Sequence, residues 1–244
     1  MTQSEHSSKQ YDIDLETLRS RVLEMGGLVE SQIHAAIDGF IVGDVSALDA
    51  VVEEDHRVNA FEVNIDTDCS HLIARRQPAA GDLRMVLAII KIVTDLERIG
   101  DEAAKIARMG KQGYSRARMP SSPIAAIKHV GDIAIGMLRK ALDALARLDP
   151  AAAAAIVRED AALDEEFRSI VHQLITFMME DPRTISTAIE IPWIAKSIER
   201  IGDHSKNMAE QVIYIVKGTD VRHTSVEALE REALSRNGPC ATAR

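Results

Sequence analysis

The feature that most constrains this chain is an internal repeat. The pentapeptide Glu-Arg-Ile-Gly-Asp at 97–101 recurs letter for letter at 199–203, an offset of 199 − 97 = 102. A second match lies one predicted helix earlier, where residues 52–59 resemble residues 157–164 at an offset of 157 − 52 = 105. Two matches in the same order at nearly the same offset indicate a duplication. The chain is therefore expected to contain two copies of one structural unit.

Both copies have the pattern of long helices. Apolar residues recur at helical spacing, and aromatic residues, which are enriched in strands, make up only 3% of the chain. Prolines at first helical positions and glycines after the periodic stretches set the expected ends. The six predicted helices cover residues 11–42, 46–77, 79–110, 123–148, 150–180 and 183–217. Because long helices with short connections favour antiparallel neighbours, the predicted fold class is all-α, with two tandem three-helix bundles related by internal duplication.

The expected domain boundaries follow from the same pattern. The only clear linker is the polar and basic stretch 111–122. We expect a first bundle at 1–112, a second bundle at 113–218 and a loosely ordered polar tail at 219–244, with room for one short helical turn. Pro192 falls inside the sixth predicted helix and predicts a kink there.

The charge balance limits the classes of partner. The chain has 29 Lys and Arg against 38 Asp and Glu, a net charge of −9, whereas nucleic acids are bound by clustered basic residues. The apolar stretch at 86–93 is short and interrupted by Lys91, so it cannot cross a bilayer, which needs about 20 apolar residues. The first ten residues lack the apolar segment of a signal peptide. We expect a cytoplasmic protein that binds no nucleic acid and does not insert into the membrane.

The repeated motif places a glutamate and an aspartate four residues apart on one helix face, in line with the apolar stripe. Two carboxylates there repel each other and need a cation, a hydrogen-bond network or water. The glycines between them, at 100 and 202, indicate close approach of a neighbouring helix, whose acidic residues would join the pair. The predicted metal ligands are Asp55, Glu97 and Asp101 in the first copy and Asp160, Asp164, Glu199 and Asp203 in the second.

Oxygen ligands from two adjacent helices suit Mg²⁺, Mn²⁺, Ca²⁺ or iron. The absence of cysteine and the scarcity of histidine at the motif argue against a structural zinc site, although the identity of the metal, zinc included, is left open. Asn59 stands where the second copy has Asp164, which predicts that the first copy is the weaker site, with Glu62 one turn further on. The alternative is that both acidic pairs are solvated helix faces.

Three segments together resemble the PhoU family of phosphate-specific transport system accessory proteins. They are the duplicated pentapeptide, the run Gln-Pro-x-x-x-Asp-Leu-Arg at 77–84 and the run Met-Met-Glu-Asp-Pro-Arg at 178–183. The resemblance implies tandem three-helix bundles whose acidic motifs carry metal ions. It also implies a homodimeric regulator that represses the phosphate-starvation response, modulates phosphate uptake and connects the ATPase subunit of the phosphate ABC transporter with a sensor histidine kinase.

Three classes of function are open at this point. The first is a non-enzymatic, metal-binding adaptor. The second is a metalloenzyme that uses carboxylate-bound ions, which would need an open coordination position and a general base. The third is a structural scaffold with solvated acid pairs. No base candidate stands apart from the predicted ligands, so no catalytic residue is predicted, and the resemblance favours the adaptor.

Overall fold

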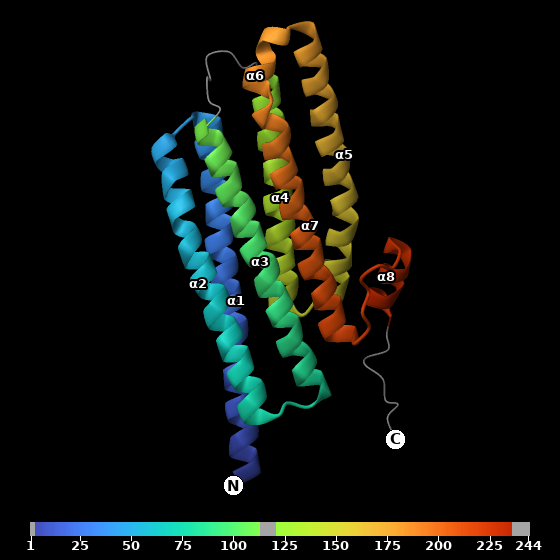
Figure 1. The fold of residues 1–244 in the computed structure, drawn as a ribbon. Coiled ribbons are helices and arrows are strands. Elements are labelled where there is room, and N and C mark those ends of the chain that lie inside the picture. The colour runs from blue at the N-terminus through green and yellow to red at the C-terminus, as the bar shows by residue number, and fades with distance from the viewer. Residues whose placement is uncertain (1–2, 113–120, 236–244) are drawn as a thin grey trace.

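The computed structural model describes residues 3–112 and 121–235, and every regular element in these two ranges is helical. The long helices are α1 (Gln3–Val42), α2 (Val45–Arg76), α3 (Ala80–Gln112), α4 (Ser121–Arg147), α5 (Pro150–Glu180) and α7 (Glu190–Lys217). A 3₁₀ turn, η2 (Pro182–Thr184), and the single-turn helix α6 (Ile185–Ala188) connect α5 to α7, and α8 (Val226–Leu234) follows α7. The predicted all-α fold with a duplicated bundle is confirmed (Figure 1).

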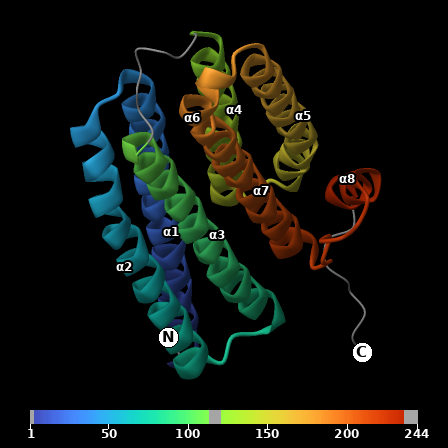
Figure 2. The same cartoon turned by 45° about the horizontal axis from the view of Figure 1, so that its top comes forward.

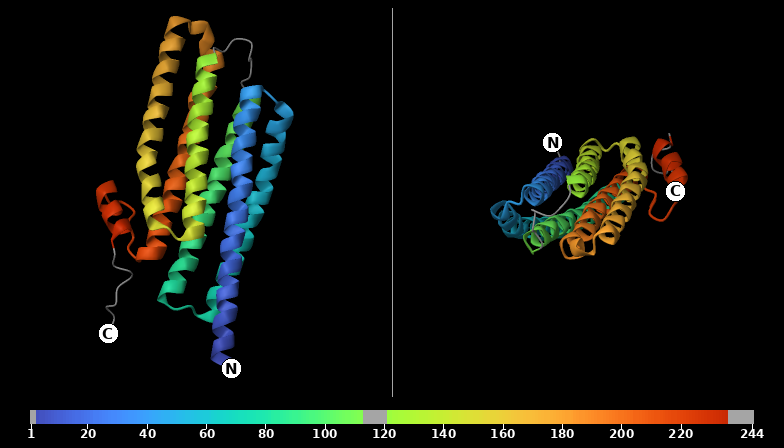
Figure 3. Two further views of the ribbon diagram at one scale, coloured as in Figure 1. Left: turned by 180° about the vertical axis from the view of Figure 1, so that it is seen from behind. Right: turned by 90° about the horizontal axis from the view of Figure 1, so that it is seen from above.

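The two repeats lie side by side and run in opposite directions along the helix axes. The α2–α3 connection is at one end of the molecule, and the α5–α7 connection is at the other (Figure 1). Seen along the helices, α3 and α7 lie next to each other, with α1 and α4 behind them and α2 and α5 on the outer sides (Figure 3). An approximate two-fold axis perpendicular to the helices therefore relates the repeats, and one apolar core runs through both.

Glycine contacts between α1 and α4 follow this two-fold axis residue by residue. A Cβ on Gly26 would lie 2.4 Å from Cδ2 of Leu142, and a Cβ on Gly131 would lie 2.6 Å from Cδ1 of Ile37. The two pairs are related by one offset, since 131 − 26 = 142 − 37 = 105. The duplication therefore includes the first helix of each repeat, and the missing side chains allow α1 and α4 to pack closely.

A buried polar pair joins α3 to α7 at the centre of the molecule. Nδ1 of His204 lies 2.9 Å from Oδ1 of Asp95, and both side chains are buried. Asn207 donates a hydrogen bond to the same oxygen at 3.3 Å. Apolar contacts are non-directional, whereas these hydrogen bonds form in only one register of the two helices, so the pair fixes how the repeats align.

The structure corrects one expectation about the second repeat and shows an ordered helix in the tail that follows it. The sixth predicted helix, 183–217, is divided at Ile189, and Pro192 lies in the first turn of α7 instead of kinking a continuous helix. Proline is tolerated there because the amides of a first turn have no partner within the helix. Within the tail expected to be loosely ordered, residues 226–234 form α8, whose Leu229 and Ala233 are buried and which packs against α5 (Figure 2). Most of the predicted linker, 113–120, and the end of the tail, 236–244, lie outside the described residues.

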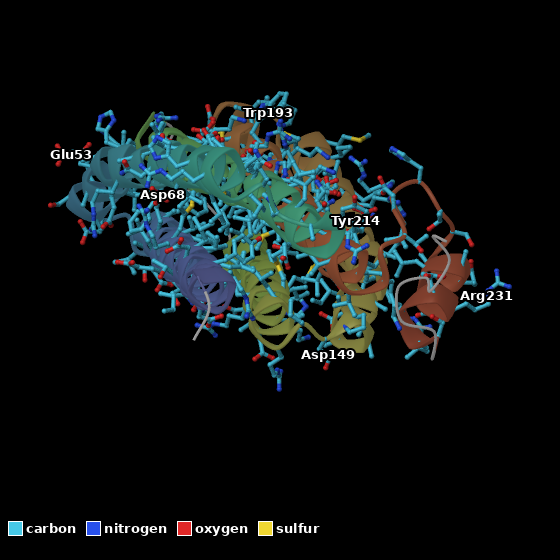
Figure 4. The ribbon with its side chains drawn as sticks, turned by 90° about the horizontal axis from the view of Figure 1, so that it is seen from below. Glu53, Asp68, Asp149, Trp193, Tyr214 and Arg231 are labelled. Carbon is cyan, nitrogen blue, oxygen red and sulfur yellow. The ribbon has the colours of Figure 1, made fainter. Side chains whose placement is uncertain are left out.

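Apolar side chains are exposed where α5 is connected to α7. Met179 is 76% exposed and Trp193 is 62% exposed, with Ile185 and Ile189 at 45% each. Figure 4 shows Trp193 at the edge of the molecule. These side chains form an apolar end surface that the described part of the chain does not cover. In the ranges described, we find no helix with the length and apolarity needed to cross a membrane.

Candidate metal centre

The first acidic cluster, defined as Asp55, Asn59, Glu97 and Asp101, lies between α2 and α3. Asp55 is only 7% exposed, and its burial, assisted by the charge of Asp101, raises the pKa of its carboxyl group. Burial also raises the pKa of Glu97, and the negative charges of Asp101, Glu62 and Asp55 raise it further. The structure thus brings the three predicted carboxylates of the first copy, and Glu62, within electrostatic range of one another.

Buried oxygen atoms without hydrogen-bond partners mark this cluster. They are Oδ1 of Asp55, Oδ1 of Asn59 and Oε1 of Gln32, a residue of α1 that is 1% exposed. The amide nitrogen of Gln32 donates to the carbonyl oxygen of Val51 at 3.2 Å, and its Oε1 lies 3.2 Å from the place that a Cβ on Gly100 would occupy. A buried oxygen that accepts no hydrogen bond destabilises the folded state, and a bound cation would remove that cost. The place where α1, α2 and α3 meet therefore fits a cation.

The basic side chains beside the first cluster do not satisfy these oxygens. Nη2 of Arg108 lies 3.9 Å from Oδ2 of Asp55, which is too far for a hydrogen bond, and the arginine side chain is 48% exposed. Arg98, the next residue after Glu97, is exposed and lowers the pKa of Glu97 only as the last of several contributions. The counter-charge supplied by the protein is therefore weak here.

The second acidic cluster, defined as Asp160, Asp164, Glu199 and Asp203, lies between α5 and α7. Asp160 and Glu199 are 6% and 9% exposed. Burial, with the charges of Glu199 and Asp160, raises the pKa of Asp203. Asp164 is half-buried and lies 4.0 Å from Arg168 on its own helix. Three of the four predicted ligands therefore approach one another, and the fourth faces a different partner.

Two lysines from α7 neutralise the second acidic cluster. Nζ of Lys206 donates to Oδ2 of Asp160 at 2.6 Å, and Nζ of Lys196 donates to Oε2 of Glu199. Both lysines also lower the pKa of Asp203. None of the four cluster residues is among the described side chains with a buried, unpartnered oxygen. The protein thus supplies the positive charge that these carboxylates need.

The two clusters differ in how well they fit a metal ion. Within 3–112 and 121–235, no three aspartate, glutamate, histidine or cysteine side chains converge closely enough to hold an ion as they stand. The open oxygens of the first cluster, however, include the amides of Gln32 and Asn59, and amide oxygens also bind hard cations. The residues present fit a cation at the first cluster, whereas ammonium groups occupy the second.

Sequence reasoning missed three side chains that complete these sites, one amide and two lysines. Gln32 interrupts the apolar stripe of its helix, which also contains Met25, Val29 and Ala36, and a polar residue at a core position is a detectable signal. Lys196 and Lys206 each stand three residues from a predicted ligand, but which carboxylate each one contacts depends on the packing of α5 against α7.

Comparison with known proteins places both repeats in one family. The family model described as PhoU domain matches residues 22–109 and again residues 127–212. The chain belongs to the PhoU family. Each match covers one repeat and includes its acidic cluster, so the PhoU fold, the duplication and the acidic motifs coincide.

PhoU relatives match almost the whole chain. The phosphate-specific transport system accessory protein PhoU homolog of Burkholderia sp is 49% identical over 94% of this chain and 98% of its own length. The PhoU accessory protein of Escherichia coli (strain K12) is 42% identical over 93% and 94%. The crystal structure of PhoU from Pseudomonas aeruginosa, 44% identical, superposes with a TM-score of 0.82 over 86% of this chain and 100% of that one. PhoU of Streptococcus pneumoniae, described as a phosphate transport system regulatory protein, gives 0.80 at 26% identity over 86% and 99%.

Proposed function

We propose that this PhoU-family chain is a cytoplasmic accessory protein of a phosphate-specific transport system, where it modulates phosphate uptake. The observation that carries the proposal is identity of 42–49% with named accessory proteins over more than nine tenths of the chain. The protein acts by binding partners and not by turnover. Its partners are the ATPase subunit of the transporter and a sensor histidine kinase, and its effect is to repress phosphate-starvation signalling when phosphate is plentiful.

Two features support an adaptor of this kind. The long helices present extended surfaces, and the apolar end surface around Met179 and Trp193 is of the kind that protein partners cover. The chain is proposed to act as a homodimer, so that each assembly presents two copies of every docking surface.

A divalent cation is proposed to be part of the folded protein. Asp55, Glu97 and Asp101, with the amide oxygens of Asn59 and Gln32, would hold it at the first acidic cluster. The ion would supply positive charge, which removes the repulsion between carboxylates and the cost of the open buried oxygens. Because the ion binds only the folded state, it stabilises that state by mass action.

The test is capture of partners from phosphate-replete cells by the tagged full-length chain, followed by mass spectrometry. We expect the transporter ATPase subunit and a histidine kinase to be recovered. Chelation of the ion should lower the melting temperature and weaken the capture of both partners together. A matched pair of variants separates the ion from net charge. Glu97→Gln/Asp101→Asn removes two cluster carboxylates, and Glu16→Gln/Asp132→Asn removes two that are 68% and 58% exposed.

The outcomes separate the candidate functions. Recovery of neither partner would overturn the adaptor role. Capture that survives removal of the ion would make the ion incidental to signalling. Turnover of phosphate esters or peroxide by the metal-loaded chain, lost in Glu97→Gln/Asp101→Asn, would favour a metalloenzyme instead. Elution at monomer mass in light scattering would contradict the homodimer.

A further inference from the structure

The two-fold axis and the repeat offsets define which residues occupy equivalent places in the two acidic clusters. A Cβ on Gly100 would contact Val58 at 3.1 Å and Gln32 at 3.2 Å. A Cβ on Gly202 would contact Leu163 at 2.2 Å and Met137 at 3.6 Å. The pairs match by offset, since 163 − 58 = 137 − 32 = 105. Met137 of α4 therefore stands in the second repeat where Gln32 stands in the first.

The remaining equivalences change the charge and the ligand chemistry of the second cluster. Offsets of 102 and 105 place Lys196 where the first repeat has Thr94, Lys206 where it has Ala104, and Phe167 where it has Glu62. The second repeat thus gains two lysines and lacks Glu62 and the amide oxygen of Gln32, while Asp164 replaces Asn59 and Glu210 replaces Arg108. Every one of these changes lies at its acidic cluster.

The contacts of the two lysines are those of counter-ions. Lys206 bonds to Asp160 at 2.6 Å, and Asp160 is one of the most buried carboxylates of the second cluster. Lys196 bonds to Glu199 and lies 5.5 Å from the ring centroid of Phe167, on the apolar side of the site. A metal ion entering this cluster would have to displace both ammonium groups from the oxygens that would bind it.

In the first repeat the corresponding oxygens have no such partner. Gln32 and Asp55 are both more than nine tenths buried, and a hydrogen bond from the Gln32 side chain stabilises the Asp55 carboxylate. Each still has one buried oxygen without a partner, and Asn59 adds a third. These oxygens belong to two amides and one carboxylate, a donor set typical of hard cations such as Mn²⁺ and Mg²⁺. They are an observation separate from the acidic character of the cluster, and they point to a ligand.

We infer that the duplicated sites have diverged into a metal-dependent first cluster, with Gln32 as an additional oxygen ligand, and a metal-independent second cluster, in which Lys196 and Lys206 replace the ion. This inference rests on the metal-binding part of the proposed function. Asn59 suggests that the first cluster is the weaker metal site, and this inference makes it the stronger one. The amide oxygen of Asn59 can still bind a cation, whereas an ammonium group competes with the cation for the carboxylates.

The experiment is Mn²⁺ titration of the full-length unmodified chain and three full-length variants, with bound metal counted by electron paramagnetic resonance and elemental analysis. Glu97→Gln/Asp101→Asn should weaken Mn²⁺ binding by at least about tenfold, and Gln32→Met, which copies the second repeat, should weaken it by about tenfold. Glu199→Gln/Asp203→Asn, the matched change in the second cluster, should leave affinity and stoichiometry as in the unmodified chain. Loss of bound metal in the second-cluster variant equal to that in the first would overturn the inference and leave metal binding itself intact.

A gain-of-site variant tests the lysines directly. Lys196→Thr/Lys206→Ala copies the first repeat and should raise the number of Mn²⁺ ions bound per chain, with a melting temperature that rises on adding Mn²⁺. Should this variant fold only when Mn²⁺ is present, the metal requirement has been transferred, and the inference is supported. Unchanged stoichiometry in a folded variant would overturn the role of the lysines. An unmodified chain that binds no Mn²⁺ at all would overturn both this inference and the proposed metal site.

Discussion

The two acidic clusters occupy equivalent places in the two repeats, yet their charges are balanced in different ways. In the first, Arg108 stays 3.9 Å from Asp55 and buried oxygens are left open. In the second, Lys206 lies 2.6 Å from Asp160, and a second lysine bonds to Glu199. The same carboxylate pattern can be neutralised by a side chain of the protein or by an ion from solution. The repeated motif by itself does not distinguish these two arrangements.

The largest effect expected from this comparison follows removal of the closer counter-ion. Lys206→Met leaves the carboxylate of Asp160 buried without its partner, and we expect it to lower the free energy of unfolding by about 2 kcal/mol in the presence of a chelator. Arg108→Met is the matched change in the first repeat. It should cost less than about 0.5 kcal/mol, because that arginine is half exposed and not hydrogen-bonded to Asp55.

Urea unfolding of the two variants beside the unmodified chain measures this difference. Equal losses would show that the two clusters depend on protein cations to the same extent, contrary to the comparison. If added Mn²⁺ restores the free energy of unfolding that Lys206→Met loses, the comparison is sharpened, because an ion has then replaced the ammonium group.

The glycines of the repeated motif should give the next effect. Alanine at Gly202 would place its Cβ 2.2 Å from Cδ2 of the buried Leu163, so the second repeat must repack. Overpacking lowers the free energy of unfolding by about 1–3 kcal/mol, and the higher helix propensity of alanine raises it by about 1 kcal/mol. The expected net decrease is about 1 kcal/mol. At Gly100 the closest contact would be 3.1 Å, and the two contributions should nearly cancel. Melting temperatures of Gly100→Ala and Gly202→Ala test this order, and a larger fall for Gly100→Ala would contradict it.

The smallest expected effect is a difference in pH dependence at equivalent positions near the ends of α3 and α7. Burial raises the pKa of Glu210 to about 7, although Lys206 and Arg222 oppose the rise. The first repeat has Arg108 at this place, since 210 − 102 = 108. The folded state holds the Glu210 proton more tightly than the unfolded chain, in which the carboxyl group has its ordinary pKa of 4.5. The resulting stabilisation is complete below about pH 4.5 and is lost as the pH rises through about 7.

Glu210→Gln should remove this loss. Between about pH 5 and about pH 8 the unmodified chain should lose about 1 kcal/mol more stability than the variant, a figure reduced to allow for partial solvent screening of the side chain. Thermal melts across this pH range, with a chelator present, provide the measurement. Arg108→Gln is the control, because its guanidinium does not titrate in this range. Parallel curves for the unmodified chain and Glu210→Gln would refute the assignment.

Much of the fold was predictable because it depends on local pattern. Helical periodicity, proline and glycine punctuation and the two offsets identify six long helices and their duplication from the sequence alone. The errors lie where tertiary contacts override the pattern. Helix α8 forms because Leu229 and Ala233 find a buried place against α5, and the break at Ile189 moves Pro192 into the first turn of α7.

The sequence by itself determined the helical class, the duplication and the identity of the paired carboxylates, because each of these is a matter of spacing along one chain. Only the tertiary structure decided which charges meet. Gln32 reaches the first cluster from a different helix, and Lys206 reaches Asp160 across the α5–α7 contact. Electrostatic interactions depend on distance and burial, and both are fixed by packing between helices that sequence spacing does not specify.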